Sequence, residues 1–232
     1  MNELMIFGDS VLKGVMFDAD TGRYRLCREP RFQPLAERGV DVENRSRMGA
    51  TIREGLRLLE QETPAEPAQV VLLEYGGNDC NYDWKAVSRA PREEHRPAVP
   101  IEEFAESYRR AIRKARELAR NVAVCSVMPL DSRKFMNFIS RGNCYDSILS
   151  WLGDVGILYR WQQLYNDVAM DVARSENCPV VDIRRFLMVR HDFDDLLCAD
   201  GIHPTSKGHK LLGSLLCREL APLLGSSPGK ES

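Results

Sequence analysis

The sequence contains no apolar run that approaches the roughly 18 residues needed to cross a bilayer. It does not open with a basic segment, an apolar core and a small-residue cleavage site, so we expect neither a signal peptide nor a membrane span. The seven cysteines are odd in number and scattered without a C-x-x-C pair, which is typical of a reduced, cytoplasmic protein. The net charge of -2 gives no electrostatic reason to expect nucleic acid or an acidic membrane as a partner.

Histidine is also scarce. The chain has four histidines, and they show no spacing typical of a transition-metal site, so we predict neither a metal nor a cofactor. The 232 residues have an ordinary composition for a soluble protein and are enough to bury one full hydrophobic core. We predict a single domain over residues 1–224, followed by a disordered tail at 225–232.

Short apolar runs alternate with longer amphipathic stretches along the chain. Runs that are apolar on both faces suit parallel strands covered by helices on each side. We predict strands at 4–8, 40–44, 70–75, 122–127 and 179–183. We predict the main helices at 51–62, 100–120, 157–175 and 206–224. This alternation predicts an α/β domain with a five-stranded parallel sheet, and right-handed crossovers favour the flavodoxin-like strand order 2-1-3-4-5.

Three connections are longer than this frame needs. Residues 11–30 form an excursion after the first predicted strand. Residues 80–100 carry a charged run and several prolines, which predicts a solvated loop. Residues 128–156 mix aromatic and apolar side chains with polar ones. That mixture favours equally a flap over the carboxyl edge of the sheet and an insertion that completes the core elsewhere.

Four short blocks follow four of the predicted strands and therefore meet at one edge of the predicted sheet. Open α/β sheets bind their ligands outside the carboxyl ends of the strands. The blocks contain, in chain order, Ser10, Gly49, Asn78 and the pair Asp200 and His203. Chance motifs would scatter between both edges and the helices, so this convergence predicts one functional site.

These residue types together suit attack by a hydroxyl group on an acyl carbon. A serine hydroxyl is inert at neutral pH and needs an adjacent base. His203 can take the proton of Ser10, and Asp200 can fix the tautomer of the ring and stabilise the imidazolium. The backbone N–H groups of Ser10 and Gly49 and the side-chain amide of Asn78 can hold the oxyanion of a tetrahedral intermediate.

Each block also has a simpler structural explanation. Gly-Asp-Ser is a common turn, and Gly-Gly-Asn-Asp can be a turn with a helix cap. Asp200 can be a capping residue without a catalytic role, and His203 can be a packing residue without one. We expect His209, inside the last predicted helix, to be a satisfied surface residue. The candidates for the substrate pocket, all neighbours of the predicted site in sequence, are Val11, Met48 and Cys80.

In this order the blocks resemble the SGNH (GDSL-like) hydrolases, whose name-giving serine, glycine, asparagine and histidine match Ser10, Gly49, Asn78 and His203. The resemblance extends from residue 6 to about residue 216, and the first block reads Gly-Asp-Ser-Val instead of Gly-Asp-Ser-Leu. It implies a flavodoxin-like three-layer α/β/α sandwich and a metal-free esterase or lipase. It also implies the same triad and the same three-donor oxyanion hole.

The function that we favour from the sequence is hydrolysis of a short acyl ester through an acyl-enzyme on Ser10, for example of an acetyl group on a carbohydrate. A lysophospholipase, a thioesterase or an acyltransferase would use the same residues. A non-catalytic binding domain would have lost one of these groups, and all are present. A metal-dependent phosphoesterase would need Asp9, Asp79, Asp200 and His203, which make a poor transition-metal site. We expect a small-molecule ester as the partner, and the oligomeric state does not follow from the sequence.

Overall fold

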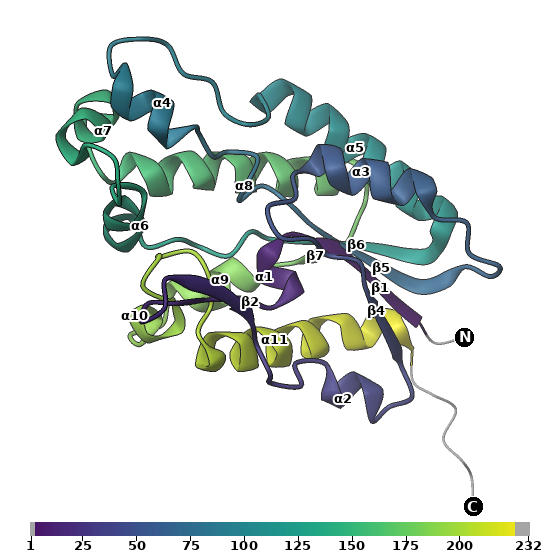
Figure 1. The fold of residues 1–232 in the computed structure, drawn as a ribbon. Helices are drawn as coiled ribbons and strands as arrows, with labels where there is room; N and C mark the ends of the chain where they lie inside the picture. The colour runs from purple at the N-terminus through teal and green to yellow at the C-terminus, as the bar shows by residue number, and fades with distance from the viewer. Residues whose placement is uncertain (1–2, 226–232) are drawn as a thin grey trace, which may run out of the picture.

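The structure, a computed structural model, describes residues 3–225, so the predicted tail at 225–232 lies almost wholly outside the described residues. Five parallel strands form the main sheet (Figure 1). In spatial order they are β4 (Asp41–Asn44), β1 (Glu3–Gly8), β5 (Ala68–Glu74), β6 (Ala119–Cys125) and β7 (Val180–Val181). Counted along the chain, this order is 2-1-3-4-5, so the predicted fold class is confirmed.

Successive side chains of β1 point to opposite faces of the sheet, so each face has its own hydrophobic core. Phe7 belongs to the core on one face, and Ile6 belongs to the core on the other. The first face is covered by α3 (Ile52–Gln61), α5 (Ile101–Leu118) and α8 (Ile157–Ser175). The second face is covered by α2 (Gln33–Ala36), α9 (Ile183–Met188) and α11 (Ser206–Leu224). Figure 1 shows the three layers, with the sheet between the two layers of helices.

The excursion predicted at 11–30 has structure of its own. It begins with the short helix α1 (Ser10–Lys13) and continues as an antiparallel hairpin of β2 (Val15–Asp18) and β3 (Arg23–Leu26). Another short helix, α10 (Phe193–Leu196), precedes α11. The hairpin and α10 lie near each other at the end of the molecule where the main strands finish (Figure 1).

The prediction of a solvated loop at 80–100 is wrong in part. Residues in this stretch form α4 (Trp84–Arg89), because the side chain of Asp83 caps the helix by accepting from the backbone N–H groups of Lys85 and Ala86. Val87 and Val99 are fully buried. The charged residues that suggested a loop occupy the outer positions, while the apolar ones join two separate cores.

The long connection at 128–156 contains two helices, α6 (Ser132–Ile139) and α7 (Tyr145–Leu152). Together with α4 and the start of α8 they enclose a third apolar cluster, separate from the two cores on the sheet. Figure 1 shows α4, α6 and α7 gathered at one end of the molecule, beyond the carboxyl edge of the sheet. This placement brings their side chains to the edge where the predicted site lies.

The expectation for His209 is wrong, because this residue is fully buried. Its Nε2 lies 3.0 Å from the carbonyl oxygen of Val15, which ties α11 to β2. Burial lowers the pKa of His209 to about 4, so the ring is neutral near pH 7. Among residues 3–225, no helix is both long and apolar enough to cross a membrane.

Candidate active site

Three predicted residues lie in one hydrogen-bonded row at the carboxyl edge of the sheet. The Nε2 atom of His203 is 2.8 Å from Oγ of Ser10, and its Nδ1 atom is 2.6 Å from Oδ2 of Asp200. Asp200 is fully buried, and the other two are nearly so. The geometry requires Nδ1–H to donate to Asp200, which leaves Nε2 free to accept from the serine hydroxyl.

The position of Ser10 follows from an abrupt change of local structure. Strand β1 ends at Gly8, and Asp9 caps helix α1, its Oδ1 accepting from the backbone N–H of Val11 at 2.7 Å. Ser10 is therefore the first residue of the helix and stands at the carboxyl end of β1, which lies between β4 and β5 in the sheet. The cap holds the serine in a fixed place relative to the strand.

Asp200 and His203 lie on a tight loop just before α11. The backbone N–H of Cys198 donates to the carbonyl oxygen of His203 at 2.8 Å, which closes the loop. Gly201 has a φ of +75°, and a Cβ atom there would lie 2.6 Å from the backbone nitrogen of Phe135. Only glycine fits such a left-handed position against neighbouring backbone. The loop is thus fixed by its own turn and by the start of α6.

Asn78 lies in a turn, four residues beyond the end of β5. Gly76 makes this turn possible, since its φ is +138° and an added Cβ would lie 2.8 Å from Cγ2 of Val127. The amide nitrogen of Asn78 donates to Oδ2 of Asp9 and to the carbonyl oxygen of Ala50, both at 3.1 Å. Through these two hydrogen bonds, Asn78 is connected to Asp9, which precedes Ser10, and to Ala50, which follows Gly49.

Gly49 lies in an exposed turn with a φ of +74°. The turn is attached to the end of β1, because the backbone N–H of Arg47 donates to the carbonyl oxygen of Gly8 at 3.0 Å. Met48, a predicted pocket residue, is 47% exposed and does not line the cavity beside Ser10. The other two pocket candidates, Val11 and Cys80, do line it.

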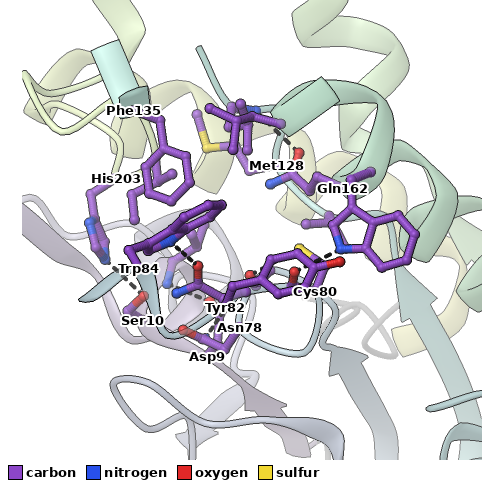
Figure 2. Close-up of a pocket in the computed structure, with 18 of the residues that line it drawn as sticks. Asp9, Ser10, Asn78, Cys80, Tyr82, Trp84, Met128, Phe135, Gln162 and His203 are labelled. Atoms are coloured by element: carbon purple, nitrogen blue, oxygen red, sulfur yellow. Dashed lines mark hydrogen bonds between the residues drawn. The ribbon is translucent and has the colours of Figure 1, made fainter. Parts of the chain in front are cut away.

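The cavity beside Ser10 and His203 has a volume of about 120 Å³. Figure 2 shows Ser10 and His203 on one side of it and Cys80 and Gln162 on the other. Cys80 is a buried filler, since its Sγ donates to the carbonyl oxygen of Gly77 and burial raises the pKa of its thiol. The connection at 128–156 contributes Met128, Leu130, Phe135, Trp151 and Leu152 to the lining.

Three buried carboxyl groups beneath the site were not predicted as a group. Glu74 is fully buried, and neither of its oxygens finds a well-aligned hydrogen-bond donor among residues 3–225. Burial, followed by the charge of Asp9, raises the pKa of Glu74 well above its usual range. Burial also raises the pKa of Asp9, and it raises that of Asp79 to about 7. Their signal in the sequence was position, since Asp9 follows β1 directly, Glu74 is the last residue of β5, and Asp79 lies in the turn after β5.

Asp79 has a structural task that the sequence did not reveal. Its Oδ1 accepts from the backbone N–H of Ile52 at 2.9 Å and thereby caps α3 from a distant part of the chain. Tyr24 on β3 was also missed, and its ring lies edge-on to the ring of His203 with centroids 5.1 Å apart. No sequence signal pointed to Tyr24, because the hairpin that carries it was not predicted.

Residues 6–211 match the model of the GDSL-like Lipase/Acylhydrolase family. The chain belongs to this family. It is 22% identical over 222 residues to the GDSL esterase/lipase WDL1 of rice (Oryza sativa subsp. japonica), covering 93% of this chain and 76% of that protein. The resemblance seen in the sequence is thereby confirmed.

Solved structures of other hydrolases share the fold. The lipase/acylhydrolase from Enterococcus faecalis superposes with a TM-score of 0.66 at 22% identity, covering 99% of this chain and all of that chain (100%). An acetylxylan esterase from Geobacillus stearothermophilus, Axe2, superposes with a TM-score of 0.62 at 16% identity, covering 94% of each chain. Membership of the GDSL-like family makes this protein a serine hydrolase of the carboxylic ester class, as predicted.

Proposed function

We propose that the protein hydrolyses carboxylic esters through an acyl-enzyme formed on Ser10. The observation that carries this proposal is the unbroken row from the serine hydroxyl through His203 to the buried Asp200. The fold does not need this chain of hydrogen bonds, because a buried serine and a buried histidine can each bond to a nearby backbone group instead. The chain of hydrogen bonds does have a chemical use, which is to make a hydroxyl nucleophilic at neutral pH.

In the first half-reaction, Oγ of Ser10 attacks the acyl carbon while its proton passes to Nε2 of His203. The tetrahedral intermediate collapses, the ester C–O bond breaks, and His203 returns the proton to the departing alcohol. In the second half-reaction, a water molecule attacks the acyl carbon while His203 takes its proton. The second tetrahedral intermediate collapses, the bond to Oγ of Ser10 breaks, His203 returns the proton to Oγ, and the acid leaves. Asp200 keeps the proton of Nδ1 in place and stabilises the transient imidazolium.

The proposed oxyanion donors are the backbone N–H groups of Ser10 and Gly49 and the amide of Asn78. The bonds of Asn78 to Asp9 and Ala50 support a fixed orientation of this amide next to the serine. To bind an oxyanion, the Asn78 nitrogen would give up or share one of these two bonds when substrate arrives. Donors that are oriented in advance contribute more than donors that must reorganise.

The substrate proposed from the sequence is a short acyl ester, and an acetyl group on a carbohydrate is one form of it. The similarity in fold to an acetylxylan esterase supports that form. A lysophospholipase, thioesterase or acyltransferase would use the same three residues, so these remain the alternatives. We also propose a reducing compartment such as the cytoplasm, which the seven free cysteines support.

A test of the mechanism is labelling by a fluorophosphonate together with hydrolysis of p-nitrophenyl butyrate in the presence of a chelator. We expect mass spectrometry to find the label on Ser10, and we expect Ser10→Ala to abolish both labelling and chelator-resistant hydrolysis. Ser214→Ala, on the exposed side of α11, is the matched control and should behave like wild type. Hydrolysis that persists in Ser10→Ala would refute the assignment of the nucleophile.

A further inference from the structure

The cavity beside Ser10 has an unusual lining. All three tryptophans of the chain, Trp84, Trp151 and Trp161, line it together with Tyr82 and Phe135. These residues come from α6, α7, α8 and the region of α4, which are not parts of the sheet. An apolar pocket with a few polar groups at one end is typical of a site for a small ligand. Here Ser10 and His203 provide the polar end.

The aromatic side chains hold one another in place. The ring of Tyr82 meets that of Trp151 edge-on at a centroid distance of 4.9 Å and that of Trp84 at 5.6 Å. Trp84 in turn meets Phe135 edge-on at 6.1 Å. Edge-to-face pairs add stability beyond the area that they bury. Because each ring supports the next, we expect the walls to keep their shape when a ligand enters.

Several polar atoms of this lining are occupied by the protein itself. The indole N–H of Trp161 donates to the carbonyl oxygen of Cys80 at 2.9 Å, and that of Trp84 donates to Oδ1 of Asn81 at 2.7 Å. The amide oxygen of Gln162 accepts from the backbone N–H of Leu130 and from Arg184. A sugar ring bound in the cavity would press most of its hydroxyl groups against apolar and aromatic side chains, where they lose their bonds to water at a cost. An apolar group has no such requirement.

The volume limits the size of that group. A dry apolar cavity of about 150 Å³ in another protein accepts benzene, so the 120 Å³ found here corresponds to roughly five carbon atoms. An acetyl group would fill only a small part of this space and would gain little from the apolar walls. A long acyl chain would not fit inside them.

We propose that this cavity binds the apolar acyl group of the substrate, with an optimum of about four to six carbons, from butanoyl to hexanoyl. The inference rests on the proposed function, since it places the acyl carbon at Ser10 and the rest of the acyl group between the aromatic rings. It deepens that function by replacing an acetyl group with a larger apolar one. The alcohol part of the ester then faces the open side of the site.

The experiment is a series of p-nitrophenyl esters from acetyl to dodecanoyl, with kcat/KM measured for each. We expect kcat/KM to rise by roughly fourfold per added methylene from acetyl to the optimum, and then to fall by at least about tenfold at dodecanoyl, where the chain outgrows the cavity. A maximum at acetyl, or a plateau that continues to dodecanoyl, would overturn the inference and leave the proposed hydrolysis intact.

Two variants should move the optimum in opposite directions. Trp151→Ala enlarges the cavity and should favour longer chains, whereas Leu158→Phe fills it from α8 and should favour acetyl. Leu164→Ala is the control, because Leu164 lies on the exposed side of the same helix and should keep the wild-type profile. Profiles that do not move in either folded variant would contradict the assignment.

Binding can be tested separately from catalysis. Since every tryptophan of the chain lines the cavity, the intrinsic fluorescence of Ser10→Ala should respond to methyl hexanoate at much lower concentration than to methyl acetate. If no ester in the series is hydrolysed by wild type but this difference is found, the proposed function fails and the acyl cavity stands. Equal responses to both esters would overturn the acyl cavity.

Discussion

At the scale of single residues, the contact between Asp200 and His203 decides which ring nitrogen carries the proton. The carboxylate accepts from Nδ1 at 2.6 Å, and its other oxygen accepts from the backbone N–H groups of Ile202 and His203 at 3.2 Å. The same side chain therefore shapes the loop and orients the ring. A substitution that keeps the shape but changes the donor pattern separates these two tasks.

We expect Asp200→Asn to lower kcat for p-nitrophenyl butyrate by about 10⁴-fold without unfolding the protein. The asparagine amide can donate to Nδ1, which moves the ring proton to Nε2, so the ring can no longer accept from Ser10. Steady-state kinetics with a thermal melt checks this. Asp195→Asn, an exposed carboxylate next to Lys207, is the control and should retain activity. A loss below tenfold in Asp200→Asn would show that this carboxylate does not set the tautomer.

A second prediction concerns the glycine between Asp200 and His203. In Gly201→Ala, the new Cβ would lie 2.6 Å from the backbone nitrogen of Phe135 and 2.8 Å from the carbonyl oxygen of Asp131. We expect a loss of stability well above the 1–2 kcal/mol of the left-handed backbone alone, with activity lost because the loop must shift. Gly142→Ala has a similar φ and open space around it, so it measures the backbone cost by itself. Equal melting temperatures for the two variants would contradict the steric argument.

At the scale of secondary structure elements, α8 connects the sheet to the cavity. Its Gln162 accepts from Leu130 and Arg184, and the guanidinium of Arg184 also donates to Gln163 at 2.6 Å and to the carbonyl oxygen of Val127 at 3.1 Å. Arg184 is nearly fully buried at the start of α9. This one cation therefore joins α8 and α9 to the segment that follows β6.

We expect Arg184→Met to lower the free energy of unfolding by about 3 kcal/mol, because buried acceptors lose their donor. Chemical denaturation measures this loss. Arg185→Met changes the neighbouring, exposed residue and should cost less than about 0.5 kcal/mol. A similar loss in the two variants would mean that the buried hydrogen bonds of Arg184 add nothing to stability.

The elements that could be predicted are those with an unambiguous hydrophobic period. The inner strands β1, β5 and β6 are buried over most of their length, so the strand order and the fold class follow from pattern and handedness. The ends of the elements do not follow from the pattern. The helix predicted at 100–120 ends at Leu118, because the next residue, Ala119, already pairs with Ala68 of β5 as the start of β6. Helix α4 was missed because its six residues are too short for a clear period and stand among charges and prolines.

The same limit applies to the candidate site. Ser10 and Asn78 could be predicted because each follows a strand whose end is set by its apolar run. Asp200 and His203 could be predicted from their residue types and spacing, although α9 and α10 separate them from β7. The aromatic lining of the cavity could not, since Trp84 is far in sequence from Trp151 and Trp161, and the three come together only through tertiary packing. In the sequence Glu74 is simply the last residue of a predicted strand. Its burial next to Asp9 could not be predicted, because it depends on the pairing of β5 with β1.

At the scale of the whole molecule, three buried carboxyl groups next to the candidate site make ionisation unfavourable in the folded protein. Asp9, Glu74 and Asp79 are buried close to one another, and burial is the largest cause of each raised pKa. A carboxyl group whose pKa is higher in the folded state stabilises the fold below its unfolded pKa. That contribution is lost as the pH rises through the folded pKa. The cluster therefore opposes stability at neutral pH, while the hydrophobic cores on both faces of the sheet outweigh it.

For Asp79 the relevant window runs from its ordinary pKa of 3.8 to about 7 in the folded protein. Within it, one such group lowers the free energy of unfolding by about 1.4 kcal/mol per pH unit as the pH rises. Asp79→Asn should reduce this slope, because asparagine does not titrate and its Oδ1 can still accept from Ile52. Urea unfolding at pH 4.5 to 7 measures it, with the exposed Asp154→Asn as a control that should keep the wild-type slope. An unchanged slope in Asp79→Asn would mean that Asp79 stays ionised throughout, and the buried proton would then have to reside on Glu74 or Asp9.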